Sequence, residues 1–306
     1  MEKTLQSSWF HWFRKKLITE FNLDIRKMKS YQPDIAPIIY CCMQHKRITP
    51  RNRTVFLSNE FKNSKWASDE IWLSLQRKIE SGEDINGYMS KRVNDWQSID
   101  YLLYTCNISH FHLYKNQKGG IREELVFGVF TKDYFYTIIV GDHNDVYNAD
   151  KLVSIAASSW PNLNIFKKSD LSTPAESTFN PREFKRVANN KNLQFNLINP
   201  TAFIDHEGQL KVIDNHQNTA LTNVTLNNID IGKIPLKVYF AYENEVKYLT
   251  DLDARLYGEY SAKRMSLCIN DKRGDYSIEI HRQRSLNKTH RIPRKYITCS
   301  LYERFK

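Results

Sequence analysis

Two stretches in the middle of the chain decide the fold: ISHFHLY at residues 108–114 and ELVFGVFTKDYFYTIIV at residues 124–140. Both are rich in the β-branched and aromatic residues that favour strands. The second stretch is divided by a tight turn at TKD, residues 131–133, and Gly119-Gly120 marks a turn after the first. Such short connections join antiparallel neighbours, so the sequence predicts three consecutive strands in a β-meander.

Helical patterns flank these strands. SIDYLLYTC at residues 98–106 predicts a short helix, and ADKLVSIAASSW at residues 149–160 predicts a second one, closed by Pro161. Residues 98–160 therefore form a predicted α-β-β-β-α unit, and the expected class is α+β.

The predicted N-terminal region, residues 1–97, is basic and mainly helical. An amphipathic helix over residues 8–22 carries an apolar side chain at every fourth position, namely at Trp9, Phe13, Leu17 and Phe21. Residues 44–57 are basic and end in a β-prone stretch. A further helix over residues 68–81 has Ser68 as its expected N-cap, ends at Gly82, and lines one face with Ile71, Leu75 and Ile79.

The second half of the chain is predicted to be mainly β-structure. Residues 161–180 are rich in Ser, Thr, Asn and Pro, which favours a linker or a long surface loop. Residues 181–306 form a β-rich, basic C-terminal region. Within this region, a helix is predicted over residues 242–258 and a β-hairpin over residues 263–285.

Composition narrows the class of protein. With 10 Gly and 9 Pro in 306 residues, the chain is neither collagen-like nor a low-complexity polymer. Its five cysteines are odd in number and lack a CxxC spacing, which excludes a disulfide framework and a structural zinc site and favours a reducing, cytoplasmic location. No apolar run approaches the roughly 20 residues that span a bilayer, so no membrane association is expected.

The net charge of +11 is unevenly distributed and favours a polyanionic partner. Residues 261–306 carry +8 and residues 14–53 carry +7, whereas the remaining 220 residues sum to −4. Cations bind phosphates and the interspersed aromatic rings stack on unpaired bases, so RNA or another nucleic acid is the expected ligand. The candidate contacts are Arg14, Lys15, Lys16, Arg51, Arg53, Lys263, Arg264, Arg282, Arg284, Arg291, Arg294 and Lys295.

Candidate catalytic side chains lie within the predicted meander. His110 and His112 are two residues apart on one strand and therefore share a face. His143 follows the end of the third strand, and Arg122 precedes the second. The up-down-up order of the strands brings His112, Arg122 and His143 to one edge of the sheet.

Two chemistries and one structural alternative fit this cluster. Histidine serves both as general base and as general acid in metal-independent RNA cleavage, and arginine matches the phosphate oxygens. Alternatively, three histidines hold a catalytic zinc, with Asp142 or Asp145 as a further ligand or support. The structural alternative is a strand that buries Phe111 and presents its histidines to solvent.

A short motif in the same region resembles an uncharacterised group of bacterial proteins. The pattern DxLLxxxxIxHxHL runs from Asp100 to Leu113, after the segments SGEDI at residues 81–85 and YMSKR at residues 88–92. Cys106 and Ser109 depart from the group's pattern, which has Trp and His there. The resemblance covers residues 75–215 and implies no activity. At the level of architecture, a short sheet with histidines and basic residues is also similar to RNase toxins of the RelE and barnase type.

The sequence therefore favours a nucleic-acid-binding protein that acts as a metal-independent endoribonuclease of the toxin or phage-defence kind. The expected catalytic residues are His110, His112, His143 and Arg122, and no cofactor is required. A protein inhibitor or partner is a further candidate ligand. Two alternatives stay open: a non-catalytic nucleic-acid-binding or regulatory module, and a histidine-ligated, metal-dependent hydrolase or nuclease.

Overall fold

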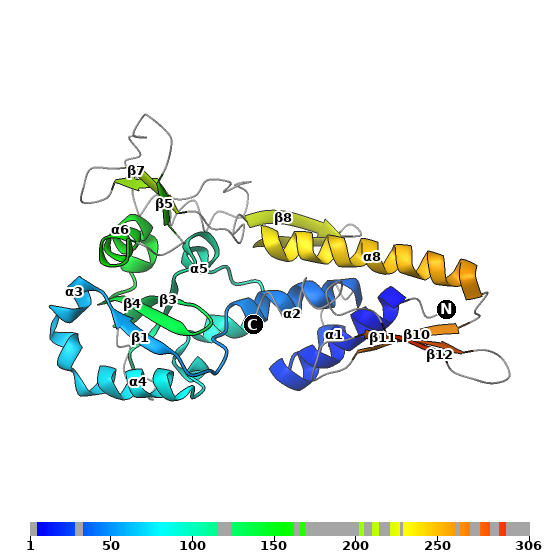
Figure 1. Cartoon of the computed structure of the whole chain (residues 1–306), viewed down its shortest axis with the longest axis horizontal. Helices are drawn as coiled ribbons and strands as arrows, with labels where there is room; N and C mark the ends of the chain where they lie inside the picture. The colour runs from blue at the N-terminus through cyan, green and yellow to red at the C-terminus, as the bar shows by residue number, and fades with distance from the viewer. Residues whose placement is uncertain are drawn as a thin grey trace. The chain divides into compact units, whose positions relative to one another are not determined.

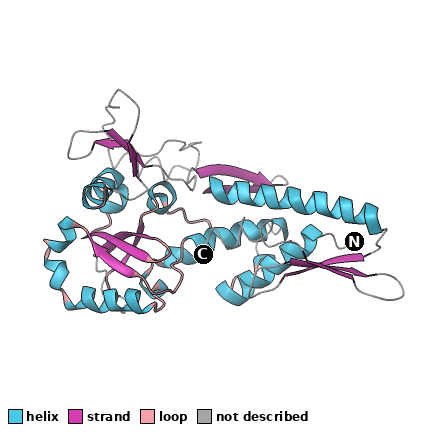
Figure 2. Cartoon of the chain, in the orientation of Figure 1, coloured by secondary structure: helices cyan, strands magenta, loops and turns pink. Residues whose placement is uncertain are grey.

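The computed structural model describes residues 5–27, 33–114, 124–161, 166–168, 202–204, 210–213, 221–226, 229–260, 264–269, 276–281 and 288–291. By packing, the chain divides into two compact units (Figure 1). Unit 1 combines residues 1–45 with residues 224–306, and unit 2 spans residues 46–223. Helices and strands are mixed in both units (Figure 2), which confirms the predicted α+β class.

The central sheet of unit 2 has four strands in the order β1-β4-β3-β2. The antiparallel strands β2 (Ser109–His112), β3 (Leu125–Phe130) and β4 (Tyr134–Gly141) confirm the predicted meander. Strand β1 (Thr54–Leu57) is the β-prone end of the basic stretch, and it pairs in parallel with β4. This fourth strand was not part of the predicted meander, because parallel partners are joined through a long crossover that leaves no local turn signal.

Helices cover both faces of this sheet, with α4 (Glu70–Ser81) on one side and α6 (Ala149–Ser159) on the other (Figure 1). Leu125, Phe127 and Val129 of β3 pack into the core beneath α6. The intervening Val126 packs into the core beneath α4. A strand buried on both faces explains the continuous apolar run of β3.

The remaining elements of unit 2 are shorter. They are α3 (Asn59–Lys62), α5 (Tyr101–Cys106), β5 (Phe166–Lys168), β6 (Ala202–Ile204), β7 (Leu210–Ile213) and the 3-10 helices η3 (Lys65–Ser68), η4 (Asn86–Tyr88), η5 (Lys91–Asn94) and η6 (Asp145–Tyr147). The last three strands form a second sheet in the order β5-β7-β6. Strand β5 lies inside the segment 161–180 that the sequence presents as a linker or long loop.

Helix α4 shows how the start of a helix can differ by one residue from its sequence signal. Asp69, not Ser68, is the N-cap, and its carboxylate accepts the N–H groups of residues 71 and 72 at 2.9 and 3.2 Å. Ser68 ends the preceding 3-10 helix η3. The buried face contains Trp72 together with the predicted Leu75 and Ile79, whereas Ile71, expected on that face, is 39% exposed.

The predicted end of α4 is confirmed at Gly82. Its φ of +78° lies in the left-handed region that glycine adopts without strain. A Cβ at this position would stand 2.6 Å from the backbone nitrogen of Asn52, so the chain before β1 also requires a glycine here.

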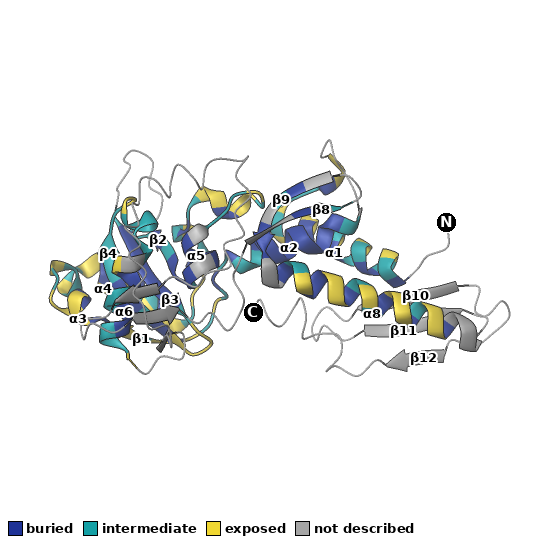
Figure 3. Cartoon of the chain, turned by 90° about the horizontal axis from the view of Figure 1, so that it is seen from above, coloured by how far each residue is buried: buried dark blue, intermediate teal, exposed yellow. Residues whose placement is uncertain are grey.

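Three helices form the main body of unit 1: α1 (Leu5–Phe21), α2 (Ala36–His45) and α8 (Leu236–Tyr260). The predicted apolar stripe of α1 is buried at Trp9, Phe13 and Leu17. Buried and exposed positions alternate along α8 (Figure 3), and Tyr242 on its buried face lies 6.1 Å from the Trp9 ring.

The other elements of unit 1 and its junction with unit 2 are two 3-10 turns and five strands. They are η1 (Ile25–Lys27), η2 (Pro33–Ile35), β8 (Leu221–Leu226), β9 (Ile229–Pro235), β10 (Arg264–Ile269), β11 (Tyr276–His281) and β12 (Lys288–Arg291). Strands β10 and β11 confirm the predicted C-terminal hairpin, and β12 extends it to three strands.

The division by packing separates residues that are neighbours in sequence. The boundary after residue 45 lies inside the region 1–97, and the boundary after residue 223 lies inside the region 181–306. Unit 1 is therefore made from both ends of the chain, with α1 in contact with β10. Within the described ranges, no helix is both long enough and apolar enough to cross a membrane.

Candidate functional site

His112 and His143 lie side by side at one end of the central sheet. Strand β2 alternates, with Phe111 buried in the core beneath α4 and both of its histidines half-buried on the opposite face. His112 pairs with Leu125, and Leu125 pairs with Gly141, so the three residues form one row across the sheet. His143 follows two residues later, and its ring centroid is 5.8 Å from that of His112.

The loop that carries His143 is held by two aspartates. The Asp142 carboxylate accepts the N–H of Asn144 at 2.7 Å, and this hydrogen bond holds the pKa of Asp142 below its ordinary value. The Asp145 carboxylate accepts the N–H of Asp142 at 3.1 Å and pairs with Lys151 of α6 at 2.7 Å. His143 is exposed at the tip of this turn.

The absence of a side chain at Gly141 leaves space for the Asp145 carboxylate. A Cβ at this position would meet Asp145 Oδ2 at 2.1 Å. The position of the His143 loop therefore depends on a glycine at the end of β4.

His110 has a more structural environment than its neighbour on the strand. Its ring stacks on Phe127 at 6.0 Å, and its side chain is 18% exposed. Its Nδ1 lies 3.6 Å from Asp100 Oδ2, outside hydrogen-bonding distance, and has no hydrogen-bond partner among the described residues. The other oxygen of Asp100 caps α5 by accepting the N–H of Leu103 at 3.0 Å.

Asp100 is the residue near the histidines that sequence reasoning did not select. Ten positions separate it from His110. Its local signals are its cap role and its place at the start of the DxLLxxxxIxHxHL motif, and neither indicates a position beside His110. The close approach to His110 arises because α5 turns back and leads directly into β2, after Asn107 ends the helix with a φ of +55°. Asp100 thus lies beside His110, the neighbour of His112 on the same face of β2.

The other catalytic and metal-binding candidates stand as follows. Arg122 lies outside the described residues. Among the described residues, no group of three His, Cys, Asp or Glu side chains is placed to hold a metal ion. The three histidines with Asp142 or Asp145 therefore do not form the metal centre that was one of the alternatives.

Arg53, predicted to contact nucleic acid, has a structural role instead. It is 7% exposed, and its guanidinium donates to the carbonyl oxygens of Thr131, Thr49 and Arg51 at 2.9–3.2 Å. Burial lowers its pKa, as does the neighbouring charge of Arg51, and Asp133 acts in the opposite direction. The sequence did not indicate this environment, because a basic residue next to a strand does not reveal whether backbone carbonyls surround it.

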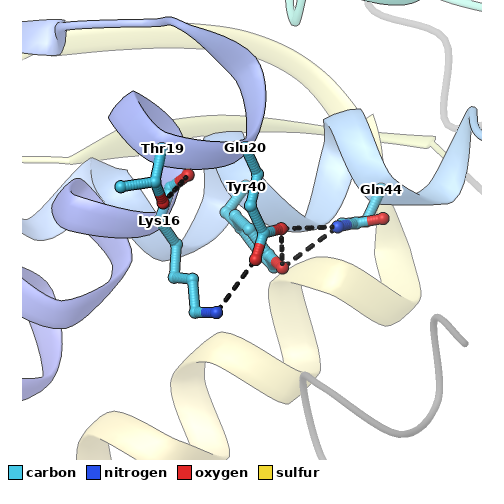
Figure 4. Close-up of polar contacts among 5 residues, drawn as sticks. All are labelled: Lys16, Thr19, Glu20, Tyr40 and Gln44. Carbon is cyan, nitrogen blue, oxygen red and sulfur yellow. Dashed lines mark hydrogen bonds and ion pairs between the residues drawn. The ribbon is translucent and has the colours of Figure 1, made fainter. Parts of the chain in front are cut away.

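The basic residues of α1 differ in exposure and in whether an acidic side chain pairs with them. Lys16 pairs with Glu20 at 2.9 Å (Figure 4), and Glu20 also accepts hydrogen bonds from Tyr40 and Gln44 of α2. Lys15 is exposed. Arg14 lies 3.0 Å from His11 Nδ1. These contacts leave α1 with a basic surface, although Lys16 is partly neutralised.

The C-terminal candidates are only partly within the described residues. Arg264 begins β10 and Arg291 ends β12. The remaining five lie outside: Lys263, Arg282, Arg284, Arg294 and Lys295. Unit 1 as a whole has 23 Lys and Arg against 14 Asp and Glu, a net charge of +9, whereas unit 2 has +2. Most of the positive charge of the chain therefore belongs to one unit, assembled from both ends.

Comparisons with protein-family models, with curated proteins and with solved structures found no match.

Proposed function

We propose that this protein binds RNA and cleaves it without a metal ion, using His112 and His143 as general acid and base. The observation that carries the proposal is the 5.8 Å separation of the two imidazole rings at the end of the sheet. At this separation both rings can approach the same phosphodiester group, which is what paired acid–base catalysis requires.

The reaction uses the ribose of the substrate as its nucleophile. One imidazole, neutral, accepts the proton of the 2′-hydroxyl, and the 2′-oxygen attacks the adjacent phosphorus. The other, protonated, donates its proton to the 5′-oxygen as the P–O5′ bond breaks. The products are a 2′,3′-cyclic phosphate and a free 5′-hydroxyl. DNA lacks the 2′-hydroxyl and is not a substrate.

The remaining candidates have supporting roles in this proposal. Arg122 is proposed to contact the phosphate, as its position in the sequence predicts. His110, stacked on Phe127 and facing Asp100, supports the strand that carries His112. The positive charge of unit 1 attracts the polyanion, so binding weakens as salt is added.

The test is an RNA-cleavage assay in EDTA. We expect cleavage of RNA and none of DNA with the same sequence. His112→Ala and His143→Ala should each lower the rate by about 10²–10⁴-fold, the usual contribution of one general acid or base. Leu73→Ala, which truncates an exposed residue of α4 outside the proposed contacts, is the control and should leave the rate unchanged.

Two results would overturn the proposal. One is a wild-type protein that does not cleave RNA; salt-sensitive binding without turnover would then favour the non-catalytic module. The other is cleavage that survives His112→Ala, which would place the chemistry elsewhere.

A further inference from the structure

Two aromatic side chains of unit 2 are exposed on the central sheet without a role in either core. Phe56 of β1 is 40% exposed and Tyr134 of β4 is 43% exposed. Their ring centroids are 5.7 Å apart. Cross-strand aromatic pairs contribute about 0.2–1 kcal/mol to a sheet. That contribution does not require ring faces to stay open to solvent, and grouped exposed rings are typical of a binding surface.

The two rings belong to a larger group that runs from the sheet to the end of α6. Tyr136 lies opposite Phe56 in the register of β1 and β4, and the two rings are stacked at 5.4 Å with 16° between their planes. Trp160 meets Tyr136 edge-on at 5.2 Å. Tyr136 and Trp160 are anchored against the core beneath α6. We call Phe56, Tyr134, Tyr136 and Trp160 the aromatic surface.

Positive charge flanks the aromatic surface at the start of β1 and β4. The buried Arg53 ties residues 49–51 to the β3–β4 turn through the carbonyl oxygens of Arg51 and Thr131. The Thr54 N–H donates to the Asp133 carbonyl at 3.0 Å. This bonding brings the backbone of Arg51 and of the exposed Lys132 to the end of the sheet where Tyr134 lies.

We propose that the aromatic surface binds the bases of single-stranded nucleic acid, with Arg51 and Lys132 next to the sugar–phosphate backbone. Exposed rings on neighbouring strands offer flat faces to unpaired bases, and each such contact is tolerant of base identity. In a duplex the faces of the bases are already stacked, so a double helix cannot use these rings. The exposed Asp133 offsets one of these two cations, and the net charge of Arg51, Lys132 and Asp133 beside the rings stays positive, which is complementary to phosphate.

This site is distinct from the His112–His143 pair. Tyr134 begins β4, and His143 lies beyond its other end. At about 3.3 Å per residue, Tyr134 lies roughly 23 Å and Tyr136 roughly 17 Å along the strand from Gly141, the last residue of β4. The proposal therefore goes beyond RNA cleavage and does not depend on it.

Binding of labelled oligonucleotides to the full-length protein tests the aromatic surface. The probes are oligo(U) and oligo(dT) of about twelve nucleotides and a duplex of equal length, followed by fluorescence anisotropy. Phe56→Ala and Tyr134→Leu should each weaken single-strand binding about tenfold, a typical effect of losing one stacked ring. Tyr134→Phe keeps the ring and should bind like wild type. Leu73→Ala, an equally exposed apolar residue on α4, is the matched control.

A crosslinking experiment gives a readout that other binding surfaces do not obscure. With 4-thiouridine in the oligonucleotide, ultraviolet light should attach it to the tryptic peptide 54–62 and to residues 134–136 of the tryptic peptide 133–151. Because the second peptide also contains His143, fragmentation of the crosslinked peptide is used to locate the attachment site. Tyr134→Leu should reduce the second crosslink, and His112→Ala should leave both unchanged.

Three outcomes would overturn the proposal. These are crosslinks that avoid both peptides, Tyr134→Leu binding like wild type, or equal binding of the duplex with the same dependence on Tyr134. The surface would be assigned to protein recognition instead if two results came together. The wild-type protein would retain a protein partner that Phe56→Ala loses, and no crosslink to RNA would form. None of these outcomes affects the cleavage assay with His112→Ala.

Discussion

Replacing Gly141 by alanine should displace the loop that carries His143. The added Cβ would stand 2.1 Å from Asp145 Oδ2 and 3.0 Å from Asp145 Cγ, so the carboxylate must move. When it moves, it no longer accepts the Asp142 N–H or pairs with Lys151. The backbone itself tolerates alanine, because Gly141 does not have a positive φ.

The cost can be worked out from these contacts. A hydrogen bond to a charged group contributes about 1.5–3 kcal/mol. The pair with Lys151 adds little, at most about 0.5 kcal/mol, because that lysine is 46% exposed and the pair is screened by solvent. Alanine recovers about 0.4–1 kcal/mol by restricting the unfolded chain. We expect Gly141→Ala to lower the free energy of unfolding by about 0.5–3 kcal/mol.

Urea unfolding together with amide chemical shifts measures this effect. The amide signals of Asp142 and Asn144 should shift, since both report on the same turn. Asp145→Ala is the companion variant, and its cost should largely disappear in the Gly141→Ala background because the carboxylate is already displaced. An unchanged unfolding free energy, or additive costs of the two substitutions, would refute the account of this loop.

Three further predictions concern the helices. Asp69→Ala should destabilise the protein by about 0.5–2 kcal/mol through loss of the N-cap, whereas Ser68→Ala should have little effect; thermal unfolding of both variants distinguishes the two positions. Trp72→Ala should lower the free energy of unfolding, measured by chemical denaturation, by about 3–5 kcal/mol because the ring is fully buried. The control is Ile71→Ala at an exposed position, which should stay within about 0.5 kcal/mol of wild type. Equal costs for the two variants would contradict the assigned buried face of α4. Burial raises the pKa of the Cys41 thiol, so iodoacetamide at pH 8 should modify it in urea but not in the native protein, as peptide mass spectrometry would show.

Local patterns were sufficient for much of the secondary structure. The alternation in residues 108–114 and 124–140, the turn between them and the four-residue spacing of Trp9, Phe13 and Leu17 all correspond to observed elements. Such patterns succeed because hydrogen bonding and side-chain direction within one element depend on near neighbours. The one-residue error at the start of α4 occurred because Ser68 was already used in the turn before it.

The candidate site was predictable in part for the same reason. Up-down-up strands connected by short turns bring His112 and His143 to one end, and the structure places their rings together. The approach of Asp100 to His110 was not predictable, because it depends on how α5 packs before β2. The contact between Phe56 and Tyr136 depends on a parallel pairing between segments about 80 residues apart.

By itself, the sequence determined the α+β class, the meander, the stripe of α1 and the positive charge at the two ends of the chain. The tertiary structure decided which of those charges are available and where they gather. It buried Arg53 among carbonyl oxygens, paired Lys16 with Glu20, and joined both ends of the chain in a unit of net charge +9. The physical reason is that helices and strands arise from interactions between near neighbours, whereas burial and charge pairing depend on residues that are distant in sequence and meet only when the elements pack.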